Sequence, residues 1–313
     1  ESGQVWRNLG FAYARQITEQ NVTEKLPEAI AAYGKSIEVD PSDPRTFTEL
    51  DILYAQRGCP ATERLAMMTQ NGHLATVLRH DDAVIRLCGL YNETGMYDEA
   101  AEILDTRHFH VWEGGGEVHD YFVDAHLLRG LERMRDADTA GAMADFRKAL
   151  EYPSNLEVGR PTSGRQDAKI LYFLAEAQSM SGDGTSAMTS LEMAVSAENA
   201  PRWIDSELTY FRILAMRKLG RSEDARELFD SFAKRVNERY ESEIGSQNAA
   251  LSGDTGNDEF SKFGEEGTRQ TRAAQTCYLR GLVYRLSDDP ESAREMFRES
   301  MRRDPNLIWP RQW

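Results

Sequence analysis

The residues best suited to chemistry gather in one short stretch, 108–117, which reads His-Phe-His-Val-Trp-Glu-Gly-Gly-Gly-Glu. Imidazole and carboxylate groups form hydrogen bonds, and an indole ring offers an apolar face to a sugar ring or a peptide. Consecutive glycines ahead of a helix leave backbone N–H groups accessible to a ligand. One hypothesis for this stretch is therefore a ligand-binding loop. Its candidate residues are His108, His110, Trp112, Glu113, Gly114 and Gly115, together with Arg160 from the following loop.

Two other interpretations fit the same stretch. In the structural one, its aromatic side chains fill a gap between two stacks of helices, and the glycines permit a sharp turn of the chain. In the metal-binding one, His108 and His110 share a face of an extended segment, and His119 or Glu113 completes the ligand set. The sequence shows no second ligand cluster. We therefore predict neither a metal ion nor a cofactor.

The motifs of the common enzyme classes are absent from the sequence. It contains no HExxH zinc motif, no GxSxG nucleophile elbow and no GxxxxGK[ST] phosphate loop. Carboxylates one helical turn apart, such as Glu113 and Glu117, are typical of the solvated face of a helix in an acidic protein. We predict a protein without enzymatic activity.

The charge of the chain also excludes classes of partner. Its net charge is −15 and its isoelectric point is about 5.0, whereas a nucleic-acid surface needs a basic stripe. No run of 18 apolar residues is present, so no membrane span is predicted. We expect neither nucleic acid nor a membrane as a partner.

A spaced pair of residues recurs along the chain, with a small residue followed four positions later by an aromatic residue or Leu. The pairs are Ala29/Tyr33, Ala100/Leu104, Ala142/Phe146, Ala187/Leu191, Ala225/Phe229 and Ala293/Phe297. A Gly lies five residues before the Ala in three of them, at Gly95, Gly182 and Gly220. With a period of about 34 residues, this pattern resembles the tetratricopeptide repeat, a helix–turn–helix unit.

The resemblance implies an all-α fold, a right-handed α-α superhelix (a tetratricopeptide solenoid) of about seven helix pairs. We expect one solenoid over residues 1–313, with a flexible acidic insertion at 245–267. The pairs are expected near 4–41, 44–72, 83–105, 117–152, 168–199, 203–244 and 270–304. The loops 108–117 and Tyr152–Pro161 each follow a second helix, and one hypothesis places them on one edge with Arg160 facing Glu113. The favoured interpretation of Tyr152–Pro161 is an ordinary extended connection between repeats.

A narrower resemblance covers residues 83–313. Two short motifs carry it. One comprises Phe109, His110, Trp112, Glu113, Gly114 and Gly115, and the other comprises Ala149, Leu150, Tyr152, Pro153, Asn155 and Leu156. Both are similar to the repeat array of bacterial proteins in which a galactose-mutarotase-like β-sandwich domain of unknown function precedes the repeats. The resemblance implies a carbohydrate-associated bacterial protein, of which we expect this chain to be a fragment.

Such arrays usually bind partners along a concave surface formed by the first helices of the pairs. We therefore predict a scaffold that binds a protein or peptide there. The alternative is an accessory module of a carbohydrate-processing protein, in which the 108–117 loop binds glycan or docks a carbohydrate-related domain of the parent protein. Three separated cysteines and the absence of a signal-peptide pattern favour a cytoplasmic location.

Overall fold

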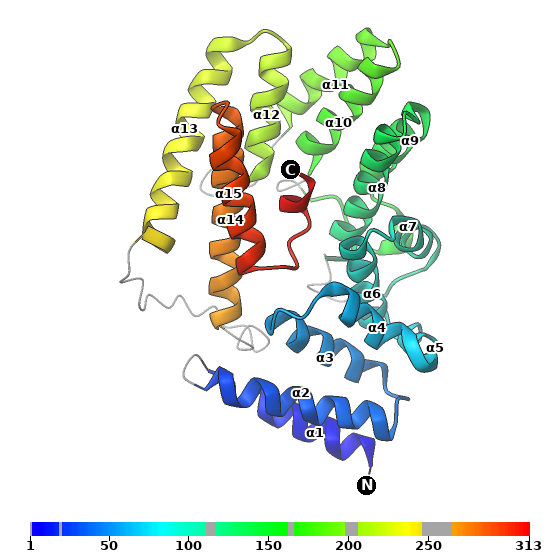
Figure 1. The fold of residues 1–313 in the computed structure, drawn as a ribbon. Coiled ribbons are helices and arrows are strands. Elements are labelled where there is room, and N and C mark those ends of the chain that lie inside the picture. Colours follow the sequence, from blue (N-terminus) through cyan, green and yellow to red (C-terminus); the bar gives the residue numbers. More distant parts are fainter. Residues whose placement is uncertain (1, 19–20, 111–116, 162–165, 198–205, 246–264) are drawn as a thin grey trace. The chain divides into compact units, whose positions relative to one another are not determined.

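The computed structural model describes residues 2–18, 21–110, 117–161, 166–197, 206–245 and 265–313. Within these ranges every regular element is a helix, as Figure 1 shows, so the expected all-α repeat fold is confirmed. No helix in this part of the chain is long and apolar enough to cross a membrane. Residues 246–264, which form most of the expected acidic insertion, lie outside the described residues.

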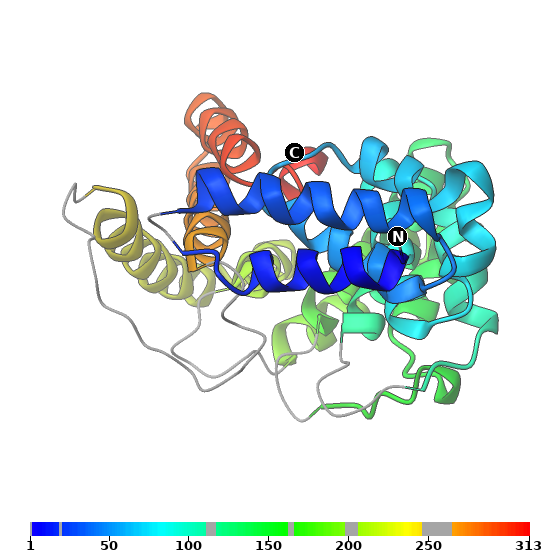
Figure 2. The ribbon, with the colours of Figure 1, turned by 90° about the horizontal axis from the view of Figure 1, so that it is seen from below.

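Taken in chain order, the helices of the described chain other than the short α5 give seven consecutive pairs. Figure 2 shows the first two helices lying side by side along their length. The pairs are α1 (Gly3–Ala14) with α2 (Val22–Val39), α3 (Pro44–Gln56) with α4 (Ala61–Thr69), α6 (Asp81–Thr94) with α7 (Tyr97–Thr106), α8 (Glu117–Arg135) with α9 (Thr139–Ala149), α10 (Asp167–Met180) with α11 (Gly184–Ser196), α12 (Glu207–Lys218) with α13 (Ser222–Tyr240), and α14 (Glu265–Leu286) with α15 (Pro290–Arg303). The short α5 (His73–Val77) follows α4.

Residue contacts divide the described chain into two compact units. The first unit comprises residues 1–95, the start of α14, the end of α15 and the C-terminal segment as far as Gln312. The second unit comprises residues 96–246, positions 276–298 of α14 and α15, and Trp313.

An aromatic ring of the second helix lies against a glycine of the first helix in three pairs. A Cβ atom added to Gly10 would lie only 2.8 Å from the ring of Tyr33. Gly130 with Phe146 and Gly281 with Phe297 repeat this contact in other pairs. The ring can approach because glycine has no side chain, and Tyr33 is consequently only 1% exposed. This contact sets how closely the two helices of a pair approach.

The glycines expected between the helices adopt the required backbone. Gly95 and Gly182 have φ angles of 81° and 85°, in the left-handed region that costs glycine little. Each residue ends a first helix and turns the chain into the second.

The second pair, α3 with α4, is held by charge rather than by an aromatic ring. Arg64 of α4 is 2% exposed and forms a bidentate ion pair with the fully buried Asp51 of α3, at 2.8 and 3.1 Å. Arg86 of α6 donates to the same carboxylate at 2.7 Å, and Asn306 accepts a hydrogen bond from Arg64. Burial raises the pKa of the neighbouring Glu93 to about 7. The buried ion pair of Arg64 and Asp51 occupies the space between the two helices, which explains why this pair lacks the Ala/aromatic pattern.

The glycine contact predicts a position-dependent effect of alanine within the first pair. Gly10→Ala forces Tyr33 aside and should destabilise the protein by about 1–3 kcal/mol. Gly34→Ala in α2 is the matched control, because nothing lies within 4 Å of its added Cβ. That control should stabilise α2 by roughly 0.5–1 kcal/mol. Urea unfolding followed by circular dichroism measures both, and equal midpoints for the two variants would contradict this account of the packing.

Candidate functional site

The structure joins the two loops that the sequence singles out, both of which belong to the second unit. The N–H of Phe109 donates to the carbonyl of Asn155 at 2.7 Å. The Asn155 side-chain amide donates to the carbonyls of Leu104 and Arg107, at 2.9 and 2.8 Å. Phe109 itself is completely buried. The loop after α7 is therefore fixed to the loop after α9 by hydrogen bonds and by one aromatic anchor.

The two histidines beside this anchor lie next to a glutamate of the other loop. His108 Nε2 is 2.8 Å from Glu157 Oε1, and His110 Nδ1 is 3.7 Å from the same oxygen. The centres of the two imidazole rings are 4.8 Å apart. All three side chains are exposed to solvent.

Glu157 was not among the candidate residues predicted from the sequence. It follows a 3-10 turn (Ser154–Leu156) and has a φ of 52°, which is uncommon for a residue with a side chain. Leu156, immediately before it, is fully buried. The turn and this backbone conformation direct the carboxylate to the histidines, and no residue-type pattern in the sequence signals such a conformation.

Arg160, the one remaining candidate residue that the structure describes, interacts with residues other than the two histidines. Arg160 Nη2 pairs with Asp167 Oδ2 at 3.0 Å, and its guanidinium group lies 5.5 Å from the centre of the Tyr152 ring. Trp112, Glu113, Gly114 and Gly115 lie outside the described residues, so the expected approach of Arg160 to Glu113 stays a prediction.

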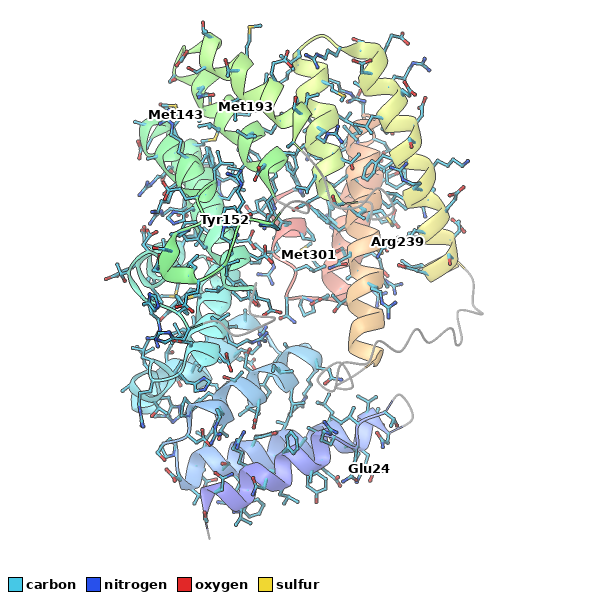
Figure 3. The ribbon with its side chains drawn as sticks, turned by 180° about the vertical axis from the view of Figure 1, so that it is seen from behind. Glu24, Met143, Tyr152, Met193, Arg239 and Met301 are labelled. Carbon is cyan, nitrogen blue, oxygen red and sulfur yellow. The ribbon has the colours of Figure 1, made fainter. Side chains whose placement is uncertain are left out.

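A pocket of about 300 Å³ opens between α8, the loop after α9 and the start of α10. Tyr152, labelled in Figure 3, lines it and stacks on His119 with ring centres 3.8 Å apart. The carboxylates of Asp120 and Asp167 also line the pocket. Burial lowers the pKa of His119, although the Glu151 carbonyl 2.9 Å from its Nε2 opposes the shift.

A second candidate site lies on the first helices of the second unit, where Trp313 packs. Its ring centre is 5.8 Å from Tyr210 and 6.3 Å from Phe211, both on α12. Its indole N–H donates to the Tyr278 hydroxyl of α14 at 3.2 Å. The guanidinium group of Arg285, also on α14, lies 4.5 Å from the ring centre. We call these four partners of Trp313 the indole site.

A buried ion pair holds the Tyr278 hydroxyl of the indole site in position. The Tyr278 hydroxyl donates to Glu207 at 2.8 Å, and Lys169 of α10, which is 1% exposed, pairs with the same carboxylate at 2.5 Å. Burial, reinforced by the Glu207 charge, raises the pKa of Tyr278 well above its ordinary value. The hydroxyl is therefore neutral at physiological pH and is held in place to accept a hydrogen bond from the indole.

Comparison with known proteins agrees with the repeat pattern. Residues 274–307, which include the α14–α15 turn, match the tetratricopeptide repeat family. A tetratricopeptide repeat protein from Parabacteroides merdae is 16% identical, with 99% of this chain and 97% of that chain covered and a TM-score of 0.48. The C-terminal part of a repeat protein from Cytophaga hutchinsonii is 10% identical, with 98% of each chain covered and a TM-score of 0.41. The P58(IPK) tetratricopeptide domain is 14% identical, with 99% and 95% covered and a TM-score of 0.34.

Because the pKa of His119 is lowered in the folded protein, this residue should make the fold less stable at acid pH. The His119 imidazole binds a proton more readily in the unfolded chain than in the folded one. Its contribution to the free energy of unfolding is therefore complete above about pH 6.5 and is lost as the pH falls below this value. His126 acts in the opposite direction, because hydrogen bonds to Asp105 and Asp145 outweigh burial and raise its pKa. The pH dependence of wild type alone contains both effects, so the effect of His119 is obtained by comparing wild type with a variant that lacks this histidine.

We expect the unfolding midpoint of wild type to fall more than that of His119→Gln between about pH 8 and about pH 5.5. Glutamine can keep a hydrogen bond to the Glu151 carbonyl but does not titrate. Urea unfolding at several pH values measures the difference. Parallel curves for the two proteins would contradict the assigned role of His119.

Proposed function

We propose that this chain is a non-enzymatic protein-interaction module that binds peptides on the first-helix surface of its second unit. The observation that carries the proposal is the seating of Trp313 in the indole site. A side chain far along the sequence from α12 occupies this surface in the way that a partner's side chain would. Tetratricopeptide repeats, which the 274–307 segment matches, generally bind proteins or peptides.

The chemistry of the indole site suits an aromatic anchor of a peptide. Tyr210 and Phe211 supply apolar ring surface, Tyr278 accepts one hydrogen bond, and Arg285 provides a cation–π contact. Tryptophan anchors in such pockets commonly dominate the binding energy of an interface. The expected partner is therefore a peptide segment that carries an exposed tryptophan or another large aromatic residue.

A carbohydrate-associated role is the second candidate, and the pocket beside Tyr152 favours it. An aromatic ring with nearby carboxylates is a common arrangement for binding a sugar. However, the Tyr152 ring already stacks on His119, so a sugar would have to use its edge or displace a neighbour. Titration of wild type and Tyr152→Ala with a glycan panel tests this role, because saturable binding lost in the variant would support it.

The peptide proposal is tested with the chain's own segment as the probe. An acetylated peptide with the sequence of residues 309–313, Trp-Pro-Arg-Gln-Trp, is titrated by calorimetry into the 313-residue chain carrying Trp313→Ala and into wild type. We expect binding to the variant at least roughly tenfold tighter, because Trp313 competes in wild type at a high effective concentration. Adding Tyr278→Phe to the Trp313→Ala chain removes the hydrogen-bond acceptor and should weaken binding by roughly 3- to 10-fold.

A peptide that ends in Ala instead of Trp is the matched control for the probe. It should bind the Trp313→Ala chain much more weakly than the parent peptide. Equal binding of the two peptides, or equal binding to both proteins, would show that the indole site does not act as a peptide anchor.

A further inference from the structure

We propose that His108, His110 and Glu157 form a binding site for a divalent transition-metal ion, with zinc as the ion. One ligand atom from each residue can be chosen so that all three lie within 4.8 Å of one another. The site is separate from the indole site and does not depend on the proposed peptide binding.

The histidine segment is preorganised for this role. The chain leaves α7 with an extended backbone at Arg107, and exposure then alternates, because His108 and His110 are exposed while Phe109 between them is buried. Phe109 points inward and is fully buried, and its N–H is fixed by the Asn155 carbonyl. His108 and His110 therefore project together to the solvent side, where an ion can enter, and the loop need not reorganise to bring them together.

The glutamate is positioned by an equivalent arrangement in the other loop. Leu156 is fully buried, and the 3-10 turn before Glu157 is held through Asn155, whose amide donates to the carbonyls of Leu104 in α7 and of Arg107 just after it. The left-handed backbone at Glu157 then directs its carboxylate to the imidazoles. A left-handed conformation in a residue with a side chain costs roughly 1–2 kcal/mol, and such strain is concentrated at functional positions.

The donor set and its spacing fit zinc. Zinc accepts imidazole nitrogen at about 2.0–2.1 Å and carboxylate oxygen at about 2.0–2.2 Å, so ligand atoms of a tetrahedral site lie about 3.4 Å apart. The observed distances to Glu157 Oε1, 2.8 Å from His108 and 3.7 Å from His110, bracket this value. Small side-chain rotations at these exposed residues are sufficient to admit the ion. The fourth position remains for water or for a donor from a partner.

This set differs from the third ligands considered from the sequence. His119 is instead stacked on Tyr152 and lies 2.9 Å from the Glu151 carbonyl, and Glu113 lies outside the described residues. The other histidine–carboxylate cluster, around His126, is a poor metal site because Arg129 is bound to its Asp145 carboxylate at 2.6 Å. Within the described residues, the cluster around Glu157 is the one that combines accessibility with three neutral or anionic donors.

Calorimetric titration of the chelator-treated, tag-free 313-residue chain with zinc tests the site. We expect one zinc ion per chain in wild type. His108→Ala, His110→Ala and Glu157→Gln should each weaken binding by at least roughly 10- to 100-fold. Glu157→Gln is nearly isosteric and exposed, so its folding should match wild type, which circular dichroism checks. Zinc should raise the unfolding midpoint of wild type and not that of Glu157→Gln.

Two control variants identify binding elsewhere. His80→Ala removes a histidine beside a carboxylate, Asp82, in the first unit, and Cys59→Ser removes a cysteine that is not buried. Both should bind zinc as wild type does. The proposal is overturned if wild type binds no zinc, if the three ligand variants keep wild-type affinity, or if a control variant loses binding instead.

Discussion

The repeat fold depends on the contact between an aromatic ring and the backbone of a neighbouring helix. At Gly10, Gly130 and Gly281 the absence of a side chain allows the ring of the following helix to lie against the first helix. The pair then approaches closely enough for its other apolar residues to interdigitate. Tyr278 of the indole site depends on this approach, because its ring lies 5.9 Å from the ring of Phe297, which packs against Gly281.

In the second helix pair, which lacks the aromatic contact, a buried ion pair takes its place and imposes a different requirement. Arg64 and Asp51 satisfy one another almost completely out of water, and removal of either would leave an unpaired buried charge. Aromatic packing tolerates changes of shape better than such a pair tolerates a change of partner. The second helix pair is therefore more specific in its residues although it matches the repeat pattern least.

The sequence allowed prediction of features that follow from spacing and not of those that depend on remote backbone geometry. The all-α repeat fold was predicted because Ala, aromatic residue and Gly recur at fixed offsets, and the two-residue spacing of His108 and His110 suggested a shared face. Glu157 was missed because its left-handed backbone has no signature in residue type. Trp313 was missed because it meets α12 about a hundred residues away along the chain, a pairing that local periodicity does not encode.

On the proposed function, the presence of Trp313 in the indole site changes what a partner would have to provide. An intramolecular side chain competes at an effective concentration that is typically millimolar, so a peptide offering only one aromatic anchor gains little by replacing it. A partner must therefore add contacts outside the indole site, which makes recognition depend on several features at once. On this proposal the aromatic pocket would be selective, because any other occupant would have to bind more tightly than the chain's own tryptophan.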